Sequence, residues 1–380
     1  MRFGEHLIME FILLEDCCEI LDSLRIPITA SNRERGIYPY YGANGIQDYV
    51  SDYIFDDDLV LLAEDGGSFG SKTKPIAYRV SGKCWVNNHA HVLKPKEGMD
   101  VDFLCYSLMF YNTEGLVNGA TRQKLTQSAM RKMKIPKFHI DVQRDIVKEI
   151  KSVMSIIDIR EKQLEKLSLL VKARFVEMFG DPDLNPMEWS ECILSDKLDI
   201  LNGYAFKSNE FDEEGEIPVL RIGNINAGYF KNVNMVYLHE DERFERCMVY
   251  PGDLVMSLTG TVGKDDYGNV CILGNDYEKY YLNQRNAKLE IREGIEKLYL
   301  SVILKFDTVK KRLTGISRGV RQANISNKDV LNLCLPMPPI ELQNQFATFV
   351  EQVNKSKVEV KKALDEAQLL FDSLMQKYFG

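Results

Sequence analysis

The sequence predicts an α+β protein that is an internal repeat: two tandem globular blocks, each followed by one long α-helix. The first observation is a motif that recurs after 200 residues, with Ile135-Pro136 and Gln143 matched by Leu335-Pro336 and Gln343. The second is that each motif opens an amphipathic stretch that ends in Phe-Gly. A period of 200 residues is too long for a solenoid and has the size of a domain with a helix. The chain is therefore expected to have pseudo-two-fold symmetry.

Each amphipathic stretch carries apolar residues at alternating steps of four and three. One series runs from Ile146 to Met178 and the other from Phe346 to Tyr378. This spacing, held over about four and a half heptads, indicates a coiled-coil seam. A helix of about 38 residues would be about 57 Å long. Two unrelated helices, each packed on its own block, are the alternative, but register, length and preceding motif all repeat together.

Breaker residues set the boundaries. Pro136 and Pro336 end the globular blocks, and Gly180 followed by Pro182 ends the first helix. The predicted segments are a first domain at 1–136, a central helix at 137–180, a second domain at 185–336 and a C-terminal helix at 337–380.

Within the blocks, short strands and turns alternate and then give way to a helix. Residues 57–63 and 252–258 are predicted strands, each followed by a turn-rich segment. Helical stretches are expected at 101–111 and 296–308. Further matches join residues 85–89 to 281–285 and Arg122-Gln123 to Arg321-Gln322, whereas residues 14–28 have little likeness to 194–206. The blocks are expected to be diverged copies of one domain.

Composition narrows the class of protein. With 380 residues and 45% apolar content, the chain can bury two cores. It has no apolar run of membrane length and no secretory leader pattern, and its eight cysteines form no C-x-x-C pair. We therefore expect a soluble cytoplasmic protein with reduced thiols.

The formal net charge of −8 argues against nucleic acid if the charges are evenly mixed. Acidic residues cluster at 56–58, 210–216 and 240–245, and basic residues at 131–134 and 310–312. Separate acidic and basic surfaces are therefore possible, and a DNA-binding function stays open.

The ordered set of motifs resembles the specificity (S) subunit of type I restriction-modification systems. The likeness covers nearly the whole chain in the family's order of recognition domain, helix, recognition domain, helix. The Pro-Pro-Ile-Glu-Leu-Gln stretch that opens the terminal helix is the most specific piece. The segments that carry the resemblance are residues 40–46, 63–68, 85–91, 201–208, 252–255, 319–326 and 338–343.

The resemblance implies a DNA-binding subunit without chemistry of its own and without a cofactor. Each target-recognition domain would read one half of an asymmetric bipartite site in double-stranded DNA. The two helices would pair as an antiparallel coiled coil, set the gap between half-sites and dock methyltransferase subunits, two in number. A restriction translocase subunit would join that complex.

Readout of DNA needs amide, hydroxyl and cationic side chains on loops that can reach base edges and phosphates. In the first block the candidates are Tyr40, Tyr41, Asn44, Ser68, Lys72, Lys74, Asn87, Asn88, His89, Arg122 and Gln123. In the second block they are Lys207, Arg221, Asn224, Thr259, Thr261, Lys264, Asn283, Gln284, Arg285, Arg321 and Gln322.

Each candidate group also has a structural interpretation. Residues 40–45 can be an ordinary β-turn with packed tyrosines, and residues 66–74 a solvated glycine loop rather than a phosphate contact. The Arg-Gln pairs can cap the following helices instead of touching DNA. His89 and His91 lack further ligands at metal spacing and are expected beside DNA or as partly buried neutral side chains, so no metal site is predicted.

Other enzyme classes lack their motifs. A P-loop needs glycine five residues before Gly263-Lys264 and a hydroxyl residue after the lysine, but Leu258 and Asp265 stand there. The Asn-Pro-Pro-Tyr motif of adenine methyltransferases is also missing. The remaining alternative is a coiled-coil scaffold whose two α+β domains bind a ligand other than DNA.

Overall fold

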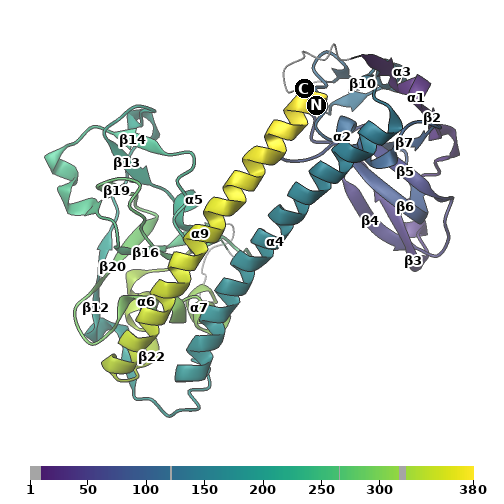
Figure 1. Cartoon of the computed structure of the whole chain (residues 1–380). Coiled ribbons are helices and arrows are strands. Elements are labelled where there is room, and N and C mark those ends of the chain that lie inside the picture. The colour runs from purple at the N-terminus through teal and green to yellow at the C-terminus, as the bar shows by residue number, and fades with distance from the viewer. Residues whose placement is uncertain (1–9, 120–121, 265, 316–321) are drawn as a thin grey trace. The chain divides into compact units, whose positions relative to one another are not determined.

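The computed structural model describes residues 10–119, 122–264, 266–315 and 322–380, with the side chain of Gln322 excluded. It divides the chain into two compact units (Figure 1). Unit 1 contains residues 1–161 and 361–380, and unit 2 contains residues 162–360. Each long helix thus contributes one half to each unit, whereas the sequence division treated the helices as separate segments.

Unit 1 is built on a six-stranded sheet in the order β2-β7-β5-β6-β3-β4, in which only β3 and β6 pair in parallel. The helix α2 (Val101–Met109) packs on β5 and β6. The sheet strands are β2 Cys18–Ile20, β3 Arg35–Gly42, β4 Gly45–Val50, β5 Phe55–Ala63, β6 Ala77–Val86 and β7 Ala90–Pro95. The remaining elements are β1 Phe11–Leu13, α1 Leu14–Cys17, β8 Val117–Asn118, β9 Lys124–Leu125, α3 Gln127–Arg131 and β10 Lys134–Pro136.

Unit 2 has two four-stranded sheets, β12-β20-β16-β18 and β14-β13-β19-β15, of which only β13 and β19 pair in parallel. The strands are β11 Glu191–Ile193, β12 Leu198–Asn202, β13 Ile217–Leu220, β14 Val236–Leu238, β15 Met248–Val249, β16 Leu254–Ser257, β17 Thr259–Thr261, β18 Val270–Ile272, β19 Tyr280–Leu282, β20 Asn286–Ile291, β21 Gln322–Asn324 and β22 Cys334–Pro336. The short helices are α5 Ile222–Ile225, α6 Lys297–Ile303, α7 Asp307–Thr314 and α8 Asn327–Leu331. The helix expected at 296–308 is broken because Phe306 adopts an extended backbone (ψ 133°) ahead of α7.

The two units open in the same way despite their different sequences. β1 pairs antiparallel with β10, and β11 pairs antiparallel with β22. Directly afterwards the Leu14 amide donates to the Met133 carbonyl (2.9 Å), and the Leu194 amide donates to the Leu333 carbonyl (3.0 Å). The internal repeat therefore extends to the first strand of each unit.

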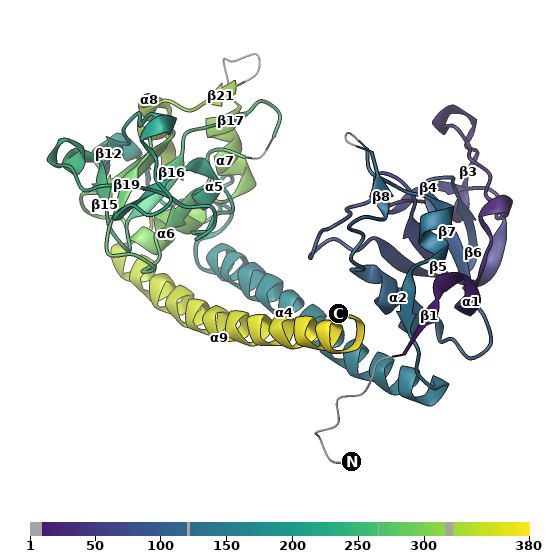
Figure 2. The ribbon, with the colours of Figure 1, turned by 90° about the horizontal axis from the view of Figure 1, so that it is seen from above.

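The long helices α4 (Ile140–Phe179) and α9 (Ile340–Phe379) have 40 residues each. In unit 1 the start of α4 and the end of α9 share one core, with Ile150 and Phe371 among its members. In unit 2 the end of α4 meets the start of α9, where Phe175 and Phe346 lie 5.5 Å apart between ring centroids. The helices thus pair antiparallel within each unit (Figure 2), and every predicted seam position is buried or half-buried. The predicted fold class is confirmed.

A buried glutamine fastens the start of each long helix to its own unit. Gln143 is 1% exposed; its side-chain carbonyl accepts the Asp100 amide (2.9 Å), and its amide group donates to the Gly98 carbonyl (2.9 Å). Gln343 is 0% exposed and accepts the Glu296 amide in the same way (2.8 Å). Asp100 and Glu296 are the N-caps of α2 and α6. The repeated glutamines of the sequence are therefore clamps between two helices.

Among the described residues, no helix combines the length and the apolar character that a membrane crossing requires. All eight cysteines have free thiols.

Replacing Gln343 by Leu should lower the free energy of unfolding by about 1–3 kcal/mol, because the Glu296 amide loses its buried acceptor. Denaturant titration followed by circular dichroism measures the change. Gln345→Leu, on the exposed face of the same helix turn, is the control and should stay within about 0.5 kcal/mol of the unsubstituted protein. Equal effects of the two substitutions would contradict the clamp.

Candidate nucleic-acid interface

One turn in each unit has the same backbone hydrogen bonds. In unit 1 the Asn87 amide donates to the Tyr41 carbonyl (3.0 Å), and the Asn87 side chain accepts the His89 amide (2.8 Å). In unit 2 the Asn283 amide donates to the Leu220 carbonyl (3.2 Å), and its side chain accepts the Arg285 amide (3.4 Å). The sequence match between residues 85–89 and 281–285 is thus a structural match, and each asparagine shapes the turn that presents its neighbours.

The strand end beside this turn is joined to it in both units. The Glu64 amide donates to the His89 carbonyl (2.9 Å), and the Leu258 amide donates to the Arg285 carbonyl (2.8 Å). Two segments far apart in the sequence therefore form one loop edge in each unit.

A third segment, residues 122–125 in unit 1 and 322–325 in unit 2, joins the same edge. Its alignment between the units differs by one residue from the one that the sequence predicted. The Leu125 amide donates to the Glu64 carbonyl (2.7 Å), and the Ile325 amide donates to the Leu258 carbonyl (2.8 Å). This register aligns Arg122 with Gln322, so the match of Arg122 with Arg321 was off by one residue. Arg321 itself lies outside the described residues, as does the side chain of Gln322.

We call residues 43–44, 65–74, 88–89 and 122–123 the unit 1 loop surface. The Asn44 amide group donates to the Gly66 carbonyl (3.0 Å) and so links two of its loops. The Asp65 carboxylate accepts from His89 Nδ1 (2.8 Å) and from the Arg122 guanidinium (2.5 Å). The Arg122 side chain remains 62% exposed, so Asp65 orients it without covering it. Asn88 and Gln123 are also exposed.

The glycine loop of this surface is more ordered than its sequence indicated. The Ser71 amide donates to the Ser68 carbonyl (3.0 Å), and the Ser71 hydroxyl accepts the Lys74 amide (2.9 Å). Gly67 is required because a Cβ atom there would lie 2.5 Å from the Ala63 side chain. Lys72 and Lys74 are exposed, and no ion pair of theirs is recorded among the described residues. They are available for phosphate.

A buried polar cluster supports the same surface from below. His91 is 0% exposed and places Nδ1 2.6 Å from the Asp22 carboxylate and Nε2 2.9 Å from the Leu125 carbonyl. Burial opposes ionisation of Asp22, but its interactions with His91, the Val92 amide and Arg25 together outweigh burial, so the pKa of Asp22 lies below its ordinary value. Glu64 completes the cluster and pairs with two cations, Arg25 (2.6 Å) and Lys124 (3.0 Å).

Asp22, Glu64 and His91 have a spacing that could hold a metal ion. Their atoms, however, already bind protein partners, and Gln127 adds a further bond to Asp22 (3.0 Å). The cluster is better explained as a fastening of the segment around Leu125.

We call residues 259–264 and 283–285 the unit 2 loop surface. Thr259 and Thr261 lie on β17, which pairs with β21, and Thr261, Lys264 and Gln284 are exposed. Arg285 takes the place of His89, and Thr259 takes the place of Asp65. No partner of the Arg285 guanidinium is recorded among the described residues, because the carboxylate of unit 1 has no counterpart here. Among the residues that the structure describes, Arg285 is therefore an exposed and unpaired cation on this surface.

A pocket of about 520 Å³ adjoins the unit 2 loop surface. In its wall Arg221 binds the Asn234 carbonyl, and the buried Asn224 donates to the Lys231 (3.1 Å) and Val233 (3.0 Å) carbonyls. The lining residues are Phe206, Ser208, Phe211, Arg221, Ile222, Gly223, Asn224, Val233, Asn234, Asn283, Gln284 and Arg285. Asn234 was missed by sequence comparison because it lies in the segment that follows β13, which has no counterpart in unit 1. Phe211, ahead of β13, was missed as well.

Three candidates are too buried to reach a base edge. Tyr40 is 1% exposed, and its hydroxyl binds the Ile28 amide (3.1 Å). Asn87 and Asn224 are 3% and 2% exposed. All three position loops instead. Tyr41 is half-buried against Tyr78, and Lys207 is exposed at the start of a short 3₁₀ turn.

Some residues of the charge clusters are paired within the protein. Asp57 pairs with Lys94 (2.7 Å), and Asp58 pairs with Arg79 (2.9 Å). Of the basic runs, Arg131 pairs with Glu15 (3.3 Å), while Arg312 pairs with Asp183 (2.8 Å). Lys310 is buried beside Asn269 (2.7 Å). Lys132, Lys134 and Lys311 remain exposed, so within the described part of the chain the basic runs are only partly structural, and exposed cations also lie outside the loop surfaces.

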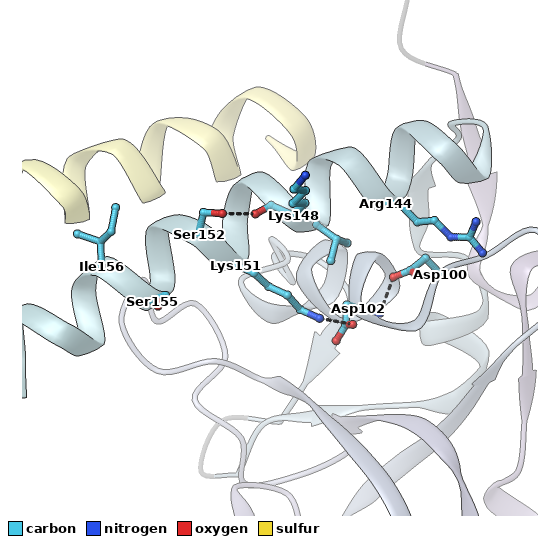
Figure 3. Close-up of a pocket in the computed structure, with 9 residues that line it drawn as sticks. Asp100, Asp102, Arg144, Lys148, Lys151, Ser152, Ser155 and Ile156 are labelled. Atoms are coloured by element: carbon cyan, nitrogen blue, oxygen red, sulfur yellow. Dashed lines mark hydrogen bonds and ion pairs between the residues drawn. The ribbon is translucent and has the colours of Figure 1, made fainter.

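Unit 1 also has an open groove of about 740 Å³ between the start of α2 and the side of α4 (Figure 3). Lys151 reaches from α4 to Asp102 (2.6 Å), which also binds Arg79 (3.3 Å). Asp100 in its wall is the N-cap of α2. None of the candidate residues lines the groove, and its ion pairs join the helix to the sheet.

Comparison with known proteins agrees with this architecture. Residues 9–169 and 186–367 each match the model of the type I restriction modification DNA specificity domain. The chain is 26% identical over 352 residues to the type I restriction enzyme specificity subunit S.HindORF215P of Haemophilus influenzae, covering 90% of this chain and 87% of that protein. It is 23% identical to the MjaVIII specificity subunit of Methanocaldococcus jannaschii, covering 93% and 89% of the two chains.

The crystal structure of the S subunit of a type I system from M. genitalium has the same fold, with a TM-score of 0.60 at 14% identity over 100% of this chain and 98% of that one. Two matched domains that span most of the sequence place the chain in the family of type I restriction modification DNA specificity domains. The chain is thus a non-catalytic specificity subunit that recognises DNA sequence and assembles with other subunits.

Proposed function

We propose that the chain reads a bipartite, asymmetric DNA site with one unit per half-site. The observation that carries this proposal is the pair of loop surfaces, which share their backbone hydrogen bonds but differ in side chains. His89 of unit 1 corresponds to Arg285 of unit 2, and Asp65 corresponds to Thr259. Base edges are distinguished by the donors and acceptors that meet them. Unlike side chains at the same positions therefore select unlike half-sites.

Phosphate contacts would come from the free cations around these surfaces. Lys72 and Lys74 belong to the unit 1 loop surface, and Lys264 belongs to the unit 2 loop surface. Such contacts hold a protein in register on the duplex but carry no sequence information. Arg285 is the strongest candidate for base recognition, because a free guanidinium can bind the O6 and N7 atoms of guanine together.

The paired helices would act as the spacer between the half-sites. A 40-residue helix spans about 60 Å, and its rise per residue is constant. Because each end of the helix pair is clamped to its unit by Gln143 or Gln343, the helix length would fix the separation of the half-sites.

The same helices would dock two methyltransferase subunits. Leu169 and Leu170 of α4 are 57% and 47% exposed, and Leu369 and Leu370 of α9 are 69% and 50% exposed. Exposing two neighbouring leucines to water is unfavourable, so such a pair on a helix surface is typical of an interaction site. The two pairs occupy corresponding positions of the repeat, which favours two copies of one partner. A restriction translocase would then join this complex.

Binding to duplex DNA tests the proposal directly. The chain, assembled with its methyltransferase partner, should bind a duplex that carries the site mapped by methylome sequencing, and the affinity should fall steeply with added salt. Arg285→Ala should weaken specific binding by about 1–3 kcal/mol and relax selectivity at one base pair.

Lys166→Ala removes one exposed charge from α4 and serves as the control, with unchanged selectivity expected. Failure of every assembly to bind DNA at low salt would support the alternative of a scaffold for another ligand.

Removing one heptad from residues 142–177 together with the matching heptad from 342–377 should shorten the recognised gap. The change is about 10 Å, or about three base pairs, with both half-site sequences retained. Methylome sequencing of cells that carry the variant gives the gap. Deletion in one helix alone is the control and should lower the melting temperature by breaking the seam. An unchanged gap in the double deletion would refute the spacer role.

Serine substitutions at the leucine pairs test the docking sites. Changing Leu169 and Leu170 should reduce the bound methyltransferase from two copies to one, and changing Leu369 and Leu370 as well should remove both. Native mass spectrometry counts the subunits. Glu165→Ser, on an exposed position of the same helix, should leave two copies bound. Full occupancy in the fourfold variant would place docking elsewhere.

A further inference from the structure

We propose that the pocket of unit 2 receives one unstacked nucleobase from the half-site that this unit reads. The inference rests on the proposed function and adds a mode of recognition to it. Bases removed from the stack are held in proteins by aromatic contacts and by hydrogen bonds to their edges. This pocket offers both kinds of group beside the free Arg285.

The lining has the required chemistry. Phe206 and Phe211 supply aromatic surface. Gln284 supplies an amide donor and acceptor, and Asn283, whose carbonyl oxygen accepts the Arg285 amide, adds an amide donor. Amides of this kind pair with two adjacent atoms of a base edge. The volume of about 520 Å³ lies within the range of about 300–1,000 Å³ that is common for small-ligand sites and leaves room for a base with its sugar.

The wall of the pocket that contains Arg221, Asn224 and Asn234 is held in place by hydrogen bonds within the protein. Asn224 is 2% exposed; its carbonyl oxygen accepts the Arg221 amide (2.9 Å), and its amide group binds the carbonyls of residues 231 and 233. The Arg221 guanidinium binds the carbonyl of Asn234, which has a positive φ of 51°. Such a conformation is uncommon for a residue other than glycine and persists where its surroundings enforce it.

Unit 1 provides an internal comparison, because the corresponding place is filled. There β3 turns directly into β4, and the side chain of Gln47 lies over Gly42, where an added Cβ would be 2.1 Å from the Gln47 amide nitrogen. The Gln47 carbonyl oxygen also accepts a hydrogen bond from the side chain of the buried Asn87 (3.1 Å). The pocket is therefore a feature of the segment at 222–235 in unit 2 and not a consequence of the shared fold.

Single mismatches provide the probe. Once the site is mapped, a series of duplexes is prepared, each with one mismatch in the unit 2 half-site. In each duplex one base is kept and its partner base is changed, and the methylated base is left out of the series. A mismatch makes extrusion easier, so at one position the assembled complex should bind the mismatched duplex at least about threefold more tightly than the matched one. Every other mismatch should weaken binding.

Gly223→Phe blocks the pocket, since a Cβ at Gly223 meets no atom within 4 Å and its side chain would enter open space. This variant should lose the mismatch enhancement and bind the matched site about tenfold more weakly. Gln284→Ala, at an exposed position of the lining, should reduce the enhancement without disturbing the fold. Ala227→Phe adds the same bulk on an exposed position outside the pocket and should behave like the unsubstituted protein.

The outcomes separate the two proposals. If the unsubstituted complex binds DNA but no position shows enhancement, or if Gly223→Phe retains it, the pocket inference is wrong while DNA reading stands. If the unsubstituted complex binds no DNA, the proposed function itself is wrong. Selectivity at the unit 1 half-site should be unchanged in Gly223→Phe, and circular dichroism and a melting temperature equal to those of the unsubstituted protein confirm that unit 2 of the variant is folded.

Discussion

The buried hydrogen bonds of Gln143 and Gln343 are the constraint on which the rest of the structure depends. Each side chain is at most 1% exposed and connects the first turn of a long helix to the N-cap of the helix that covers the domain core. A buried amide without its partners costs more than a typical hydrogen bond gains, so both ends of the connection are fixed in one geometry. The start of each long helix is therefore held on its own unit.

From this fixed base, each unit builds its loop edge with backbone hydrogen bonds. In unit 1 the backbone amides of Glu64 and Leu125 donate the hydrogen bonds that join the three segments of the edge. In unit 2 the amides of Leu258 and Ile325 donate the corresponding bonds. Because main-chain bonds are independent of side-chain identity, the side chains at the edge were free to diverge while the turns kept their shape. A scaffold of this kind suits a recognition protein, since specificity can change without refolding.

The sequence predicted the features that depend on local periodicity. The heptad register placed both long helices, and the asparagine turns were matched correctly because Asn283 and Asn87 occur in similar short motifs. Long-range features could not be predicted. Burial of Asn224 depends on a loop that folds back over it, and the one-residue shift at Arg122 is visible only in the hydrogen bonds of its strand. An asparagine that shapes a loop and one that reads a base look alike in sequence.

The sequence also could not show which charged side chains are paired. The pairing explains how a chain with a net charge of −8 can still present a positive surface to DNA. Carboxylates such as Asp58 and Asp183 are bound to arginines of the protein, so their field at a distance is reduced. On the loop surfaces the balance is reversed, because Lys72 and Arg285 have no recorded partner among the described residues. At physiological salt, interactions between exposed charges fade over about 8 Å. A phosphate at the loop edge therefore responds to these nearby cations far more than to the acidic total of the chain.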